Sequence, residues 1–539
     1  MTEHKHIGKI VGALMAAAVA FCLIVTLFAD RFVAVSGSSA TTMEYESTLF
    51  DTSEIMTVNI IMDEDQWQEL LDNAISEEYY ACDVEINGET ISNVGIRAKG
   101  NTSLSSIAND PDTDRYSFKI KFDKYVDGQT CMGLDKLVLN NNFADATNRK
   151  EALVYDMFQY LGADASLYHY SKISVNGEYW GTYLALEAVE DSFKLRNYGV
   201  SDGNLYKPET MGMGNDQKED GGKPDGNPPE RPNNADFPSS EEGDLAKDNN
   251  PMDRPERPQG DFDQADMDEK FRNPQGDPGD FGNRNGGADL NYTDDDADSY
   301  STIWDGADGK VTDSDKERVV TAIKNINEGT NLTTYLDVDN ILKYMAVHEF
   351  VVNLDSLSGN MAHNYYLYEN DGQLNIIPWD YNLSFGGMTN GGMGGGPGRE
   401  STESSGATSM INDPIDTPFD GTDFFDALLE NEEYLAQYHE YLRQLAEEYV
   451  QGGRLQEVWE RLDAQTDELI ETDPTAFYTA AEYEEAKETL WTVLQLRAES
   501  VLGQLDGTIP STDDGQQNAQ DTLIDGSAID LSVMGEFNH

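Results

Sequence analysis

The alternation of apolar and polar residues predicts β-hairpins in the first half of the chain. Short strand-like runs flank Asn87-Gly88, and the same arrangement recurs around Asn176-Gly177. Asn-Gly pairs favour two-residue hairpin turns in which both central residues need positive φ angles. The sequence therefore predicts antiparallel sheet from about Met56 onward.

A longer period predicts helices farther along the chain. Apolar residues recur every four positions between Thr147 and Leu161, and Gly162 follows where a helix commonly ends. Apolar side chains also share one face over residues 336–352, and three helices are expected between residues 423 and 505. Strands and helices together predict an α+β fold.

Residues 208–290 interrupt this folded unit. They are rich in Gly, Pro, Asn, Asp and Glu and contain few apolar residues. Such a segment cannot bury enough apolar surface to fold, and it is far longer than an ordinary loop. We predict a disordered acidic insertion, a folded unit made of residues 51–207 and 291–505, and a polar tail over residues 506–539.

The N-terminus carries a signal for export. An uncharged, mostly apolar run extends from Ile10 to Ala29, and Lys5 and Lys9 precede it. Twenty helical residues span roughly 30 Å, the thickness of the hydrocarbon core of a bilayer. The positive charge keeps the N-terminal end in the cytoplasm. We predict a signal anchor over residues 1–30, a linker over residues 31–50 and a single-pass protein of the cell membrane whose body is extracytoplasmic. A cleaved signal peptide is the alternative.

Composition narrows the range of partners. The chain has 36 basic and 101 acidic side chains, a formal net charge of −65. Nucleic acids and anionic lipid surfaces would repel such a protein, so we expect no nucleic-acid partner. Three cysteines exclude a scaffold rich in disulfides, and Cys82 and Cys131 lie beyond the apolar run. Either one disulfide or two buried thiols is compatible with their positions.

The segment from residue 353 to residue 386 carries the most informative chemistry. Asp355 follows a predicted helix, Asn364 opens a strand, Asp371-Gly372 turns the chain, and Asp380 ends the return strand. A hairpin brings its ends together, so Asn364 and Asp380 are expected to be close, with Asp355 beside them. Carboxylate and amide oxygens can bind Mg²⁺, and a further carboxylate can accept a hydroxyl proton. Protein kinases show the same order of groups. A loop cap and a strand end are the purely structural alternatives.

A second candidate region follows a strand-like run that ends near Lys99. Gly100 permits close approach of the backbone, and Asn101, Thr102 and Ser103 can donate hydrogen bonds to phosphate oxygens. This region matches neither of the common glycine-rich phosphate loops, and by itself it is a weak signal.

The strand over residues 116–122 adds two cations. Lys119 and Lys121 share one face, where one of them could hold nucleotide phosphates, although lysines on the wet side of a sheet are the alternative. Glu187 closes an apolar strand, and a buried acid there would need a cation such as Lys119. A Glu at an exposed edge is the plainer explanation.

Several short segments occur in one order along the chain: RAKGNTS (97–103), DRYSFKIKF (114–122), VNGEYWGTYLALE (175–187), GNLYK (203–207), NLD (353–355), HNYYLY (363–368) and IPWDYN (377–382). Together they resemble the CotH spore-coat kinase family, a group of atypical secretory-pathway kinases. The resemblance covers about residues 57–207 and 300–473, on both sides of the acidic insertion. It implies an atypical protein-kinase-like fold with antiparallel sheets and a C-terminal helical part.

The resemblance implies a role for each residue of the acidic set. Asp355 is expected to be the catalytic acid/base, with Asp380 and Asn364 as ligands of Mg²⁺ or Mn²⁺. Many members carry a further Asp where this chain has Asn382. A second carboxylate ligand from that position is therefore unsupported.

The resemblance also assigns the nucleotide contacts. Lys119 is expected to face the phosphates of ATP, with Glu187 as its partner. The loop formed by Gly100, Asn101, Thr102 and Ser103 is expected to cover the nucleotide.

These features together predict an extracytoplasmic atypical Ser/Thr protein kinase. It would transfer the γ-phosphoryl group of ATP to surface or envelope proteins. The alternative is a non-catalytic scaffold or adhesion protein, although the joint presence of Asp355, Asn364 and Asp380 argues against a decayed site. A third possibility keeps the nucleotide chemistry and changes the acceptor, or transfers AMP instead of phosphate.

Overall fold

The computed structural model describes residues 41–210, 286–358, 362–388, 403–417, 419 and 421–535. The predicted membrane anchor and most of the acidic insertion lie outside these residues and stay predictions. Among the helices in the described ranges, none is both long enough and apolar enough to cross a membrane.

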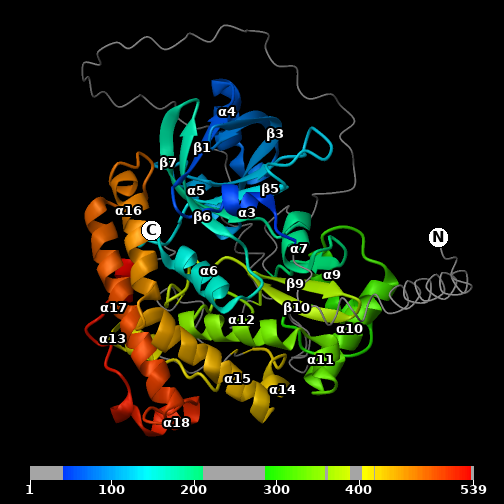
Figure 1. Cartoon of the computed structure of the whole chain (residues 1–539), viewed down its shortest axis with the longest axis vertical. Coiled ribbons are helices and arrows are strands. Elements are labelled where there is room, and N and C mark those ends of the chain that lie inside the picture. Colours follow the sequence, from blue (N-terminus) through cyan, green and yellow to red (C-terminus); the bar gives the residue numbers. More distant parts are fainter. Residues whose placement is uncertain are drawn as a thin grey trace, which may run out of the picture.

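A closed seven-stranded barrel forms the first half of the fold, at the top of Figure 1. Its strands follow the order β1-β2-β3-β4-β5-β7-β6, and only β1 and β6 pair in parallel. Asn87 and Gly88 have φ angles of 50° and 84°, and Asn176 and Gly177 have 52° and 86°, so both predicted hairpins are confirmed. The strands are β1 (Met56–Ile61), β2 (Tyr80–Ile86), β3 (Glu89–Lys99), β4 (Ser117–Lys121), β5 (Lys136–Asn140), β6 (Tyr168–Val175) and β7 (Glu178–Glu187).

The two faces of the barrel wall meet two different cores. Inward-facing residues such as Phe118 and Leu137 fill the barrel together with the aromatic and aliphatic side chains of β1, β2 and β3. Val138, Leu184 and Leu186 point the other way and belong to the larger core of the lower part. The barrel therefore rests on the remainder of the protein through the outer face of β5, β6 and β7.

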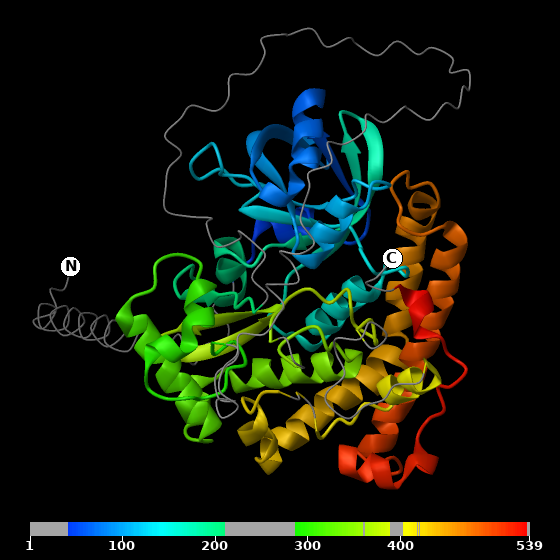
Figure 2. The same cartoon turned by 180° about the vertical axis from the view of Figure 1, so that it is seen from behind.

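The lower part combines a small sheet with many helices (Figure 2). Its antiparallel sheet has the order β10-β9-β8, and Asp371 and Gly372, with φ angles of 51° and 86°, turn the β9–β10 hairpin as predicted. The strands are β8 (Asn204–Tyr206), β9 (Tyr365–Asn370) and β10 (Gln373–Pro378). The longer helices are α6 (Lys150–Leu161), α7 (Asp191–Tyr198), α10 (Asp313–Asn327), α12 (Val338–Val351), α13 (Glu403–Ile411), α15 (Glu432–Arg443), α16 (Arg454–Glu471) and α17 (Ala480–Leu505).

Shorter helices complete the architecture. On the barrel side, α4 packs against the barrel wall and α5 follows β3; the others connect the elements of the lower part. The bounds are α3 (Glu44–Thr48), α4 (Glu64–Asp72), α5 (Thr102–Asn109), α9 (Ser301–Asp305), α11 (Leu332–Tyr335), α14 (Asp426–Leu429), the π-helical turn Gln444–Val450 and α18 (Asp513–Asn518).

Two predicted helices are confirmed with small changes. Helix α6 ends where predicted, at Gly162 with a φ angle of 68°. Helix α12 starts two residues later than predicted and is buried on nearly all sides, because it lies under the small sheet, against α6 and α15. Buried residues therefore occur on more faces of α12 than the single apolar face predicted from the sequence.

Both ends of the described chain pack more tightly than predicted. Tyr45 and Leu49 are fully buried, so the predicted linker over residues 31–50 already belongs to the body from Met43 on.

In the predicted polar tail, Leu531 and Met534 are buried, and the Met534 carbonyl accepts a hydrogen bond of 3.1 Å from the Ala146 amide. Residues 531–534 of the predicted tail therefore pack against the body of the protein. Isolated apolar residues in a polar sequence have no periodicity that reveals such packing.

The acidic insertion also ends earlier than predicted. Ala288 and Leu290 are fully buried, and Leu290 belongs to the large core. The fold thus resumes by Gly286, before the predicted boundary at residue 291.

Cys82 and Cys131 are separate, buried thiols. Of the two arrangements left open by the sequence, the structure has the one without a disulfide. Burial raises the pKa of the Cys131 thiol to about 12, so this side chain is a poor nucleophile at neutral pH.

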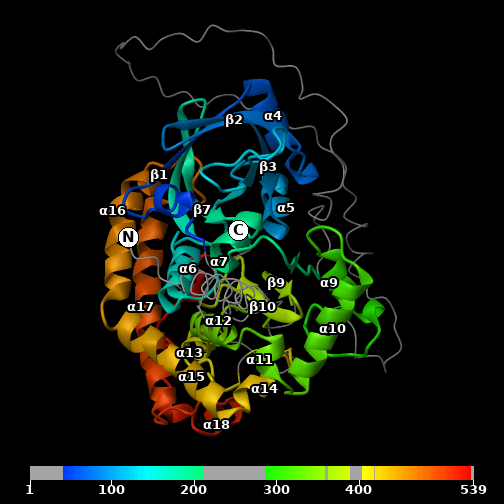
Figure 3. The same ribbon diagram turned by 45° about the vertical axis from the view of Figure 1, so that its right-hand side comes forward.

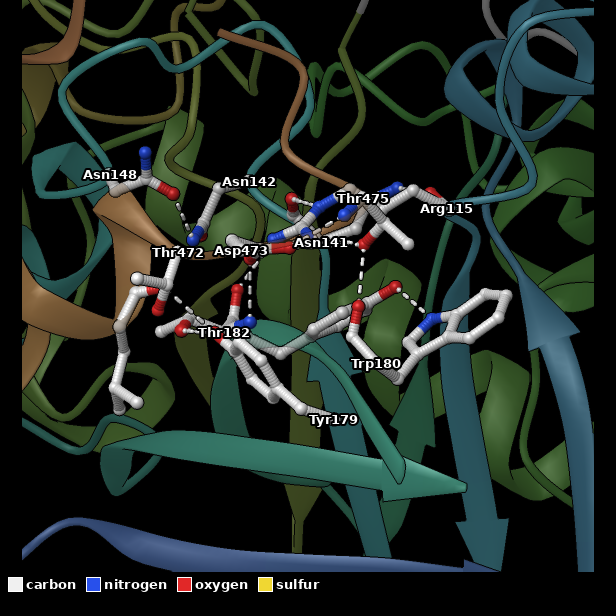
Figure 4. A network of polar contacts seen from close by, with 12 residues as sticks. Arg115, Asn141, Asn142, Asn148, Tyr179, Trp180, Thr182, Thr472, Asp473 and Thr475 are labelled. Carbon is white, nitrogen blue, oxygen red and sulfur yellow. Dashed lines mark hydrogen bonds and ion pairs between the residues drawn. The ribbon is translucent and has the colours of Figure 1, made fainter. Parts of the chain in front are cut away.

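A buried ion pair connects the barrel to the helical part (Figure 4). Arg115, just before β4, lies 2.9 Å from the carboxylate of Asp473, in the loop between α16 and α17. Arg115 also donates to the carbonyl of Thr182 in β7 at 2.6 Å, and Asp473 accepts a hydrogen bond from the Thr182 amide at 2.8 Å. Both charged side chains are 3% exposed or less.

We expect Arg115→Ala to destabilise the protein by about 3 to 5 kcal/mol, because it leaves the Asp473 carboxylate buried without its partner. Urea denaturation followed by tryptophan fluorescence measures the change. Lys343→Ala is the control, since Lys343 and Asp339 form a more exposed pair one turn apart on α12 and are worth under about 1 kcal/mol. Equal midpoints for the two variants would contradict the prediction.

Candidate active site

The β9–β10 hairpin brings the two predicted metal ligands together. Tyr365 pairs with Pro378 at the open end of the hairpin, so Asn364 immediately precedes one strand and Asp380 follows the other by two residues. Both residues have left-handed backbone conformations, with φ angles of 57° and 60°. Non-glycine residues adopt this conformation rarely, and it concentrates at functional sites.

Asp355 lies against the same end of the hairpin and is held by two neighbours. The Asn364 side-chain amide donates to the Asp355 carbonyl at 2.8 Å and to carboxylate oxygen Oδ2 at 3.1 Å. His363 Nε2 lies 2.8 Å from the other oxygen, Oδ1. Each carboxylate oxygen has a second lone pair, so the group can still accept a proton from a substrate hydroxyl.

These contacts also fix the orientation of the Asn364 amide. Both of its Asp355 partners are acceptors, so the NH₂ group must face them and the amide oxygen faces elsewhere. That oxygen is the atom a hard divalent cation would bind.

Asp380 is a half-buried carboxylate in need of a cation. Burial raises its pKa; Lys99 acts against this effect, and the neighbouring Asp355 carboxylate adds to it. Two carboxylates and an amide oxygen at one place suit Mg²⁺ or Mn²⁺, whose remaining ligands would be phosphate and water oxygens. Within the described ranges, no group of three His, Cys, Asp or Glu side chains gathers as a metal site, so the candidate depends on Asp380 and Asn364.

A chain of polar contacts reaches this site from the barrel. Lys99 Nζ, at the end of β3, donates to Asn140 Oδ1 at 2.9 Å, and Asn140 Nδ2 donates to Glu151 in α6 at 2.8 Å. Burial, together with the charge on Asp380, raises the pKa of Glu151 to about 8. Lys99, Glu151 and Asp380 therefore act on one another electrostatically across the boundary between barrel and hairpin. The sequence reading missed Asn140 and Glu151 and gave Lys99 no role.

The structure does not bring Lys119 and Glu187 together. Lys119 is in register with Val138 of β5, whereas Glu187 is in register with the preceding residue, Leu137. Neighbouring residues of a strand point to opposite faces, so the side chains of Lys119 and Glu187 lie on opposite faces of the sheet. Glu187 instead binds Arg196 of α7, with 2.6 Å between Nη2 and Oε2. The expected pairing of these two residues is wrong.

Lys119 nevertheless lies on the same sheet face as Lys99. Arg97 pairs with Lys119 and Lys99 pairs with Ser117, so both lysines project from the side that carries Val138. Lys99 is at the end of its strand nearest Asp380, which makes it the better candidate for binding phosphate.

The predicted glycine-rich loop starts a helix. Asn101 precedes α5, which begins at Thr102, and Gly100 has a φ angle of 131°. A β-carbon on Gly100 would lie 2.9 Å from Ser103 Oγ, so only glycine allows this entry into the helix. The segment from Gly100 to Ser103 therefore places the N-terminus of α5 directly after Lys99, and the N-terminus of a helix suits phosphate oxygens.

Asn382 is used structurally. Its side-chain amide donates to the Phe143 carbonyl at 3.0 Å, in the loop between β5 and α6. An Asp here could not donate this hydrogen bond, so the residue connects the hairpin to the loop in front of Glu151.

His348 of α12 connects the two acidic segments. Its Nδ1 lies 3.0 Å from the hydroxyl of Tyr381, next to Asp380, and its Nε2 lies 2.6 Å from the hydroxyl of Ser358, three residues after Asp355. The imidazole is 2% exposed, and burial lowers its pKa to about 3. A neutral His348 thus fixes the spacing of the two segments.

We expect this histidine to make the protein sensitive to acid. The unfolded state takes up a proton on His348 below about pH 6.5 and the folded state does so only near pH 3, so stability falls as the pH falls through this window. The loss between pH 7 and pH 5 should be about 2 kcal/mol. Urea denaturation of the wild type and of His348→Gln at both pH values tests this, and an equal pH dependence in both proteins would contradict it.

Comparison with known proteins places this geometry in a family. The family model described as CotH kinase protein matches residues 96–501, well over half of the chain. The match starts within β3 and ends within α17, so it includes Lys99, Glu151, Asp355 and Asp380. A search among curated proteins found no match. The chain is a member of the CotH kinase protein family.

Proposed function

We propose that this protein is an ATP-dependent kinase that phosphorylates Ser or Thr hydroxyls of proteins outside the cytoplasm. The observation that carries the proposal is the meeting of Asp355, Asn364 and Asp380 at one end of the β9–β10 hairpin, close to Lys99 on the barrel. Membership of a kinase family supports the same reaction.

We further propose that the barrel and the part below it correspond to the two lobes of an atypical protein-kinase-like fold. Lys99 comes from the barrel, whereas Glu151 of α6, Asp355 and Asp380 come from the lower part. A nucleotide between these parts would have a cation above its phosphates and carboxylates below them. Protein kinases use this arrangement of charges.

The residues divide the work of phosphoryl transfer. The acceptor hydroxyl attacks the γ-phosphorus, the bond from that phosphorus to the bridging oxygen breaks, and ADP leaves with the electron pair. Asp355 orients the hydroxyl and accepts its proton, while Asn364 and His363 hold the carboxylate in place. Lys99 offsets the negative charge of the phosphates. A divalent cation held by Asp380 and the Asn364 oxygen would neutralise phosphate charge when bound.

The proposed location and acceptor follow from the sequence. The apolar run from Ile10 to Ala29 supports export with retention in the membrane, and the net charge of −65 does not favour nucleic acid as an acceptor. Surface or envelope proteins are therefore the proposed substrates.

Label transfer from ATP tests the proposal. The full chain, purified in detergent, is incubated with Mg²⁺ or Mn²⁺ and with ATP labelled at either the γ or the α phosphate, with and without a protein rich in Ser and Thr. Label from the γ position alone, found by mass spectrometry on Ser or Thr, is the expected result. Label from the α position would indicate transfer of AMP. No label, together with no stabilisation by ATP and metal in thermal unfolding, would leave the non-catalytic scaffold as the better explanation.

A further inference from the structure

We propose that Lys207 binds the phosphoryl group during its transfer, opposite Lys99, and that Tyr366 and Trp379 hold the two lysines on either side of Asp380. This inference rests on the proposed kinase function. It gives a role to the last residue of the GNLYK segment, which the site described above does not include.

Two aromatic rings in contact with each other each carry one of the lysines over their face. Tyr366 of β9 and Trp379, next to Asp380, contact edge to face, with 5.4 Å between ring centroids. Lys207 Nζ lies over the Tyr366 ring at 6.0 Å, and Lys99 Nζ lies over the Trp379 ring at 5.8 Å. Aromatic faces attract cations at these distances. Both lysines also act on the Asp380 carboxylate and favour its ionised form.

The backbone of Lys207 is held firmly. It follows β8, which pairs with β9, and its amide donates to the Gly306 carbonyl at 2.7 Å. A β-carbon on Gly306 would lie 2.1 Å from the Lys207 carbonyl oxygen, so the two backbones are in direct contact. The Lys207 side chain is 24% exposed, so a ligand can reach its ammonium group while the backbone of the residue is held in place.

Glu209 is the group that a phosphate would displace. Its carboxylate lies 2.7 Å from Lys207 Nζ and is 23% exposed. An ion pair of this exposure is worth little, so a phosphoryl group of higher charge can take its place. Glu209 thus keeps the ammonium group in position until the nucleotide arrives.

The elements around each lysine indicate which phosphate it meets. Lys99 belongs to the barrel, beside Gly100 and the start of α5. Lys207 lies over Tyr366, two residues after Asn364, whose amide holds the proposed proton acceptor Asp355. Lys207 is therefore on the acceptor side, where the γ-phosphoryl group moves. It keeps its own proton throughout and stabilises charge on the non-bridging oxygens while the bond to ADP breaks and the bond to the acceptor forms.

Three single variants of the full chain test the role in catalysis. Lys207→Met removes the charge and keeps the stem, Lys207→Arg keeps the charge, and Lys343→Met is the control, since Lys343 pairs with Asp339 on the surface of α12. We expect Lys207→Met to lower kcat about 10- to 100-fold. Lys207→Arg should retain more activity, and Lys343→Met should equal the wild type. A kcat for Lys207→Met within threefold of the wild type overturns the inference.

A double variant separates phosphate binding from a structural role. If Lys207 served only to neutralise Glu209, then Lys207→Met/Glu209→Gln would recover wild-type kcat, which would also overturn the inference. We expect the double variant to stay as slow as Lys207→Met.

Nucleotide binding provides a measurement that does not depend on turnover. In thermal unfolding with Mg²⁺, ATP should stabilise the wild type more than ADP does, and Lys207→Met should lose this difference while its stability without nucleotide is unchanged. A difference as large as in the wild type would overturn the inference. A wild type that binds ATP and transfers no label would contradict the proposed function, and the comparison of ATP with ADP would still decide the role of Lys207.

Discussion

Asp355→Asn should lower kcat by about 10³-fold or more, while the variant folds normally and still binds ATP. The substitution keeps the shape of the side chain, but an amide cannot take up the proton of the attacking hydroxyl, a contribution of about 10² to 10⁴ in general-base catalysis. The electrostatic balance around Asp380 also changes, because Asp355 is one of its charged neighbours. Initial rates with γ-labelled ATP and a Ser/Thr protein give kcat, and thermal unfolding with and without ATP reports folding and binding.

Asp371→Asn is the matched control for this variant. Asp371 lies at the opposite end of the same hairpin, in the turn, with a φ angle of 51° that Asn tolerates equally well. Its activity should stay within twofold of the wild type. If Asp355→Asn kept more than about a tenth of wild-type kcat, another group would have to accept the proton.

Lys99→Met should lower kcat about 10²- to 10³-fold, whereas Lys119→Met should change it less than threefold. Both lysines project from the same sheet face, but Lys99 lies at the end of its strand and acts on both Glu151 and Asp380. Loss of its charge would remove the cation over the phosphates and weaken ATP binding as well. The two lysines lie on neighbouring strands, two positions apart in register, so each variant is the control for the other.

The comparison needs kcat and KM for ATP from the same preparations, with thermal midpoints to exclude unfolding. Equal losses in both variants would mean that the phosphates extend along the sheet face to Lys119. A loss in Lys119→Met alone would restore the assignment made from the sequence and remove Lys99 from the site.

The sequence predicted the hairpins, because each hairpin turn depends on the conformational preferences of two adjacent residues. Asn-Gly and Asp-Gly pairs specify their turns through backbone conformation, so the hairpins around Gly88, Gly177 and Gly372 could be placed from sequence. Hairpin closure in turn predicted that Asn364 and Asp380 come together. The packing of Leu531 and Met534 had no such local signal, because it depends on contacts with a loop nearly 400 positions earlier.

The sequence predicted that a lysine of the barrel would face the phosphates, but not which lysine. Strand alternation gives the face of Lys119 but not how far along the sheet the nucleotide site lies. The partner of the cation depends on strand register and on the position of α6, and neither is visible in sequence. The sequence suggested Glu187 as the partner of the phosphate-binding lysine, because it is a lone acid at the end of an apolar strand. In the structure Glu187 pairs with Arg196. The buried acid of α6 that Lys99 acts on is Glu151.

The contact between Arg115 and Asp473 has a consequence for how the molecule moves. Helices α16 and α17 run along the side of the barrel and of the lower part, with Trp459 and Trp491 packed between them (Figure 3). Their connecting loop is bound to β7 through Asp473. Separation of the barrel from the lower part would have to break a buried, hydrogen-bonded ion pair, so hinge opening should be a rare excursion rather than a step in each turnover. Under the proposed kinase function, ATP would then enter and ADP would leave through side-chain and loop movements. Amide hydrogens around Thr182 should exchange as slowly as those of the protein core.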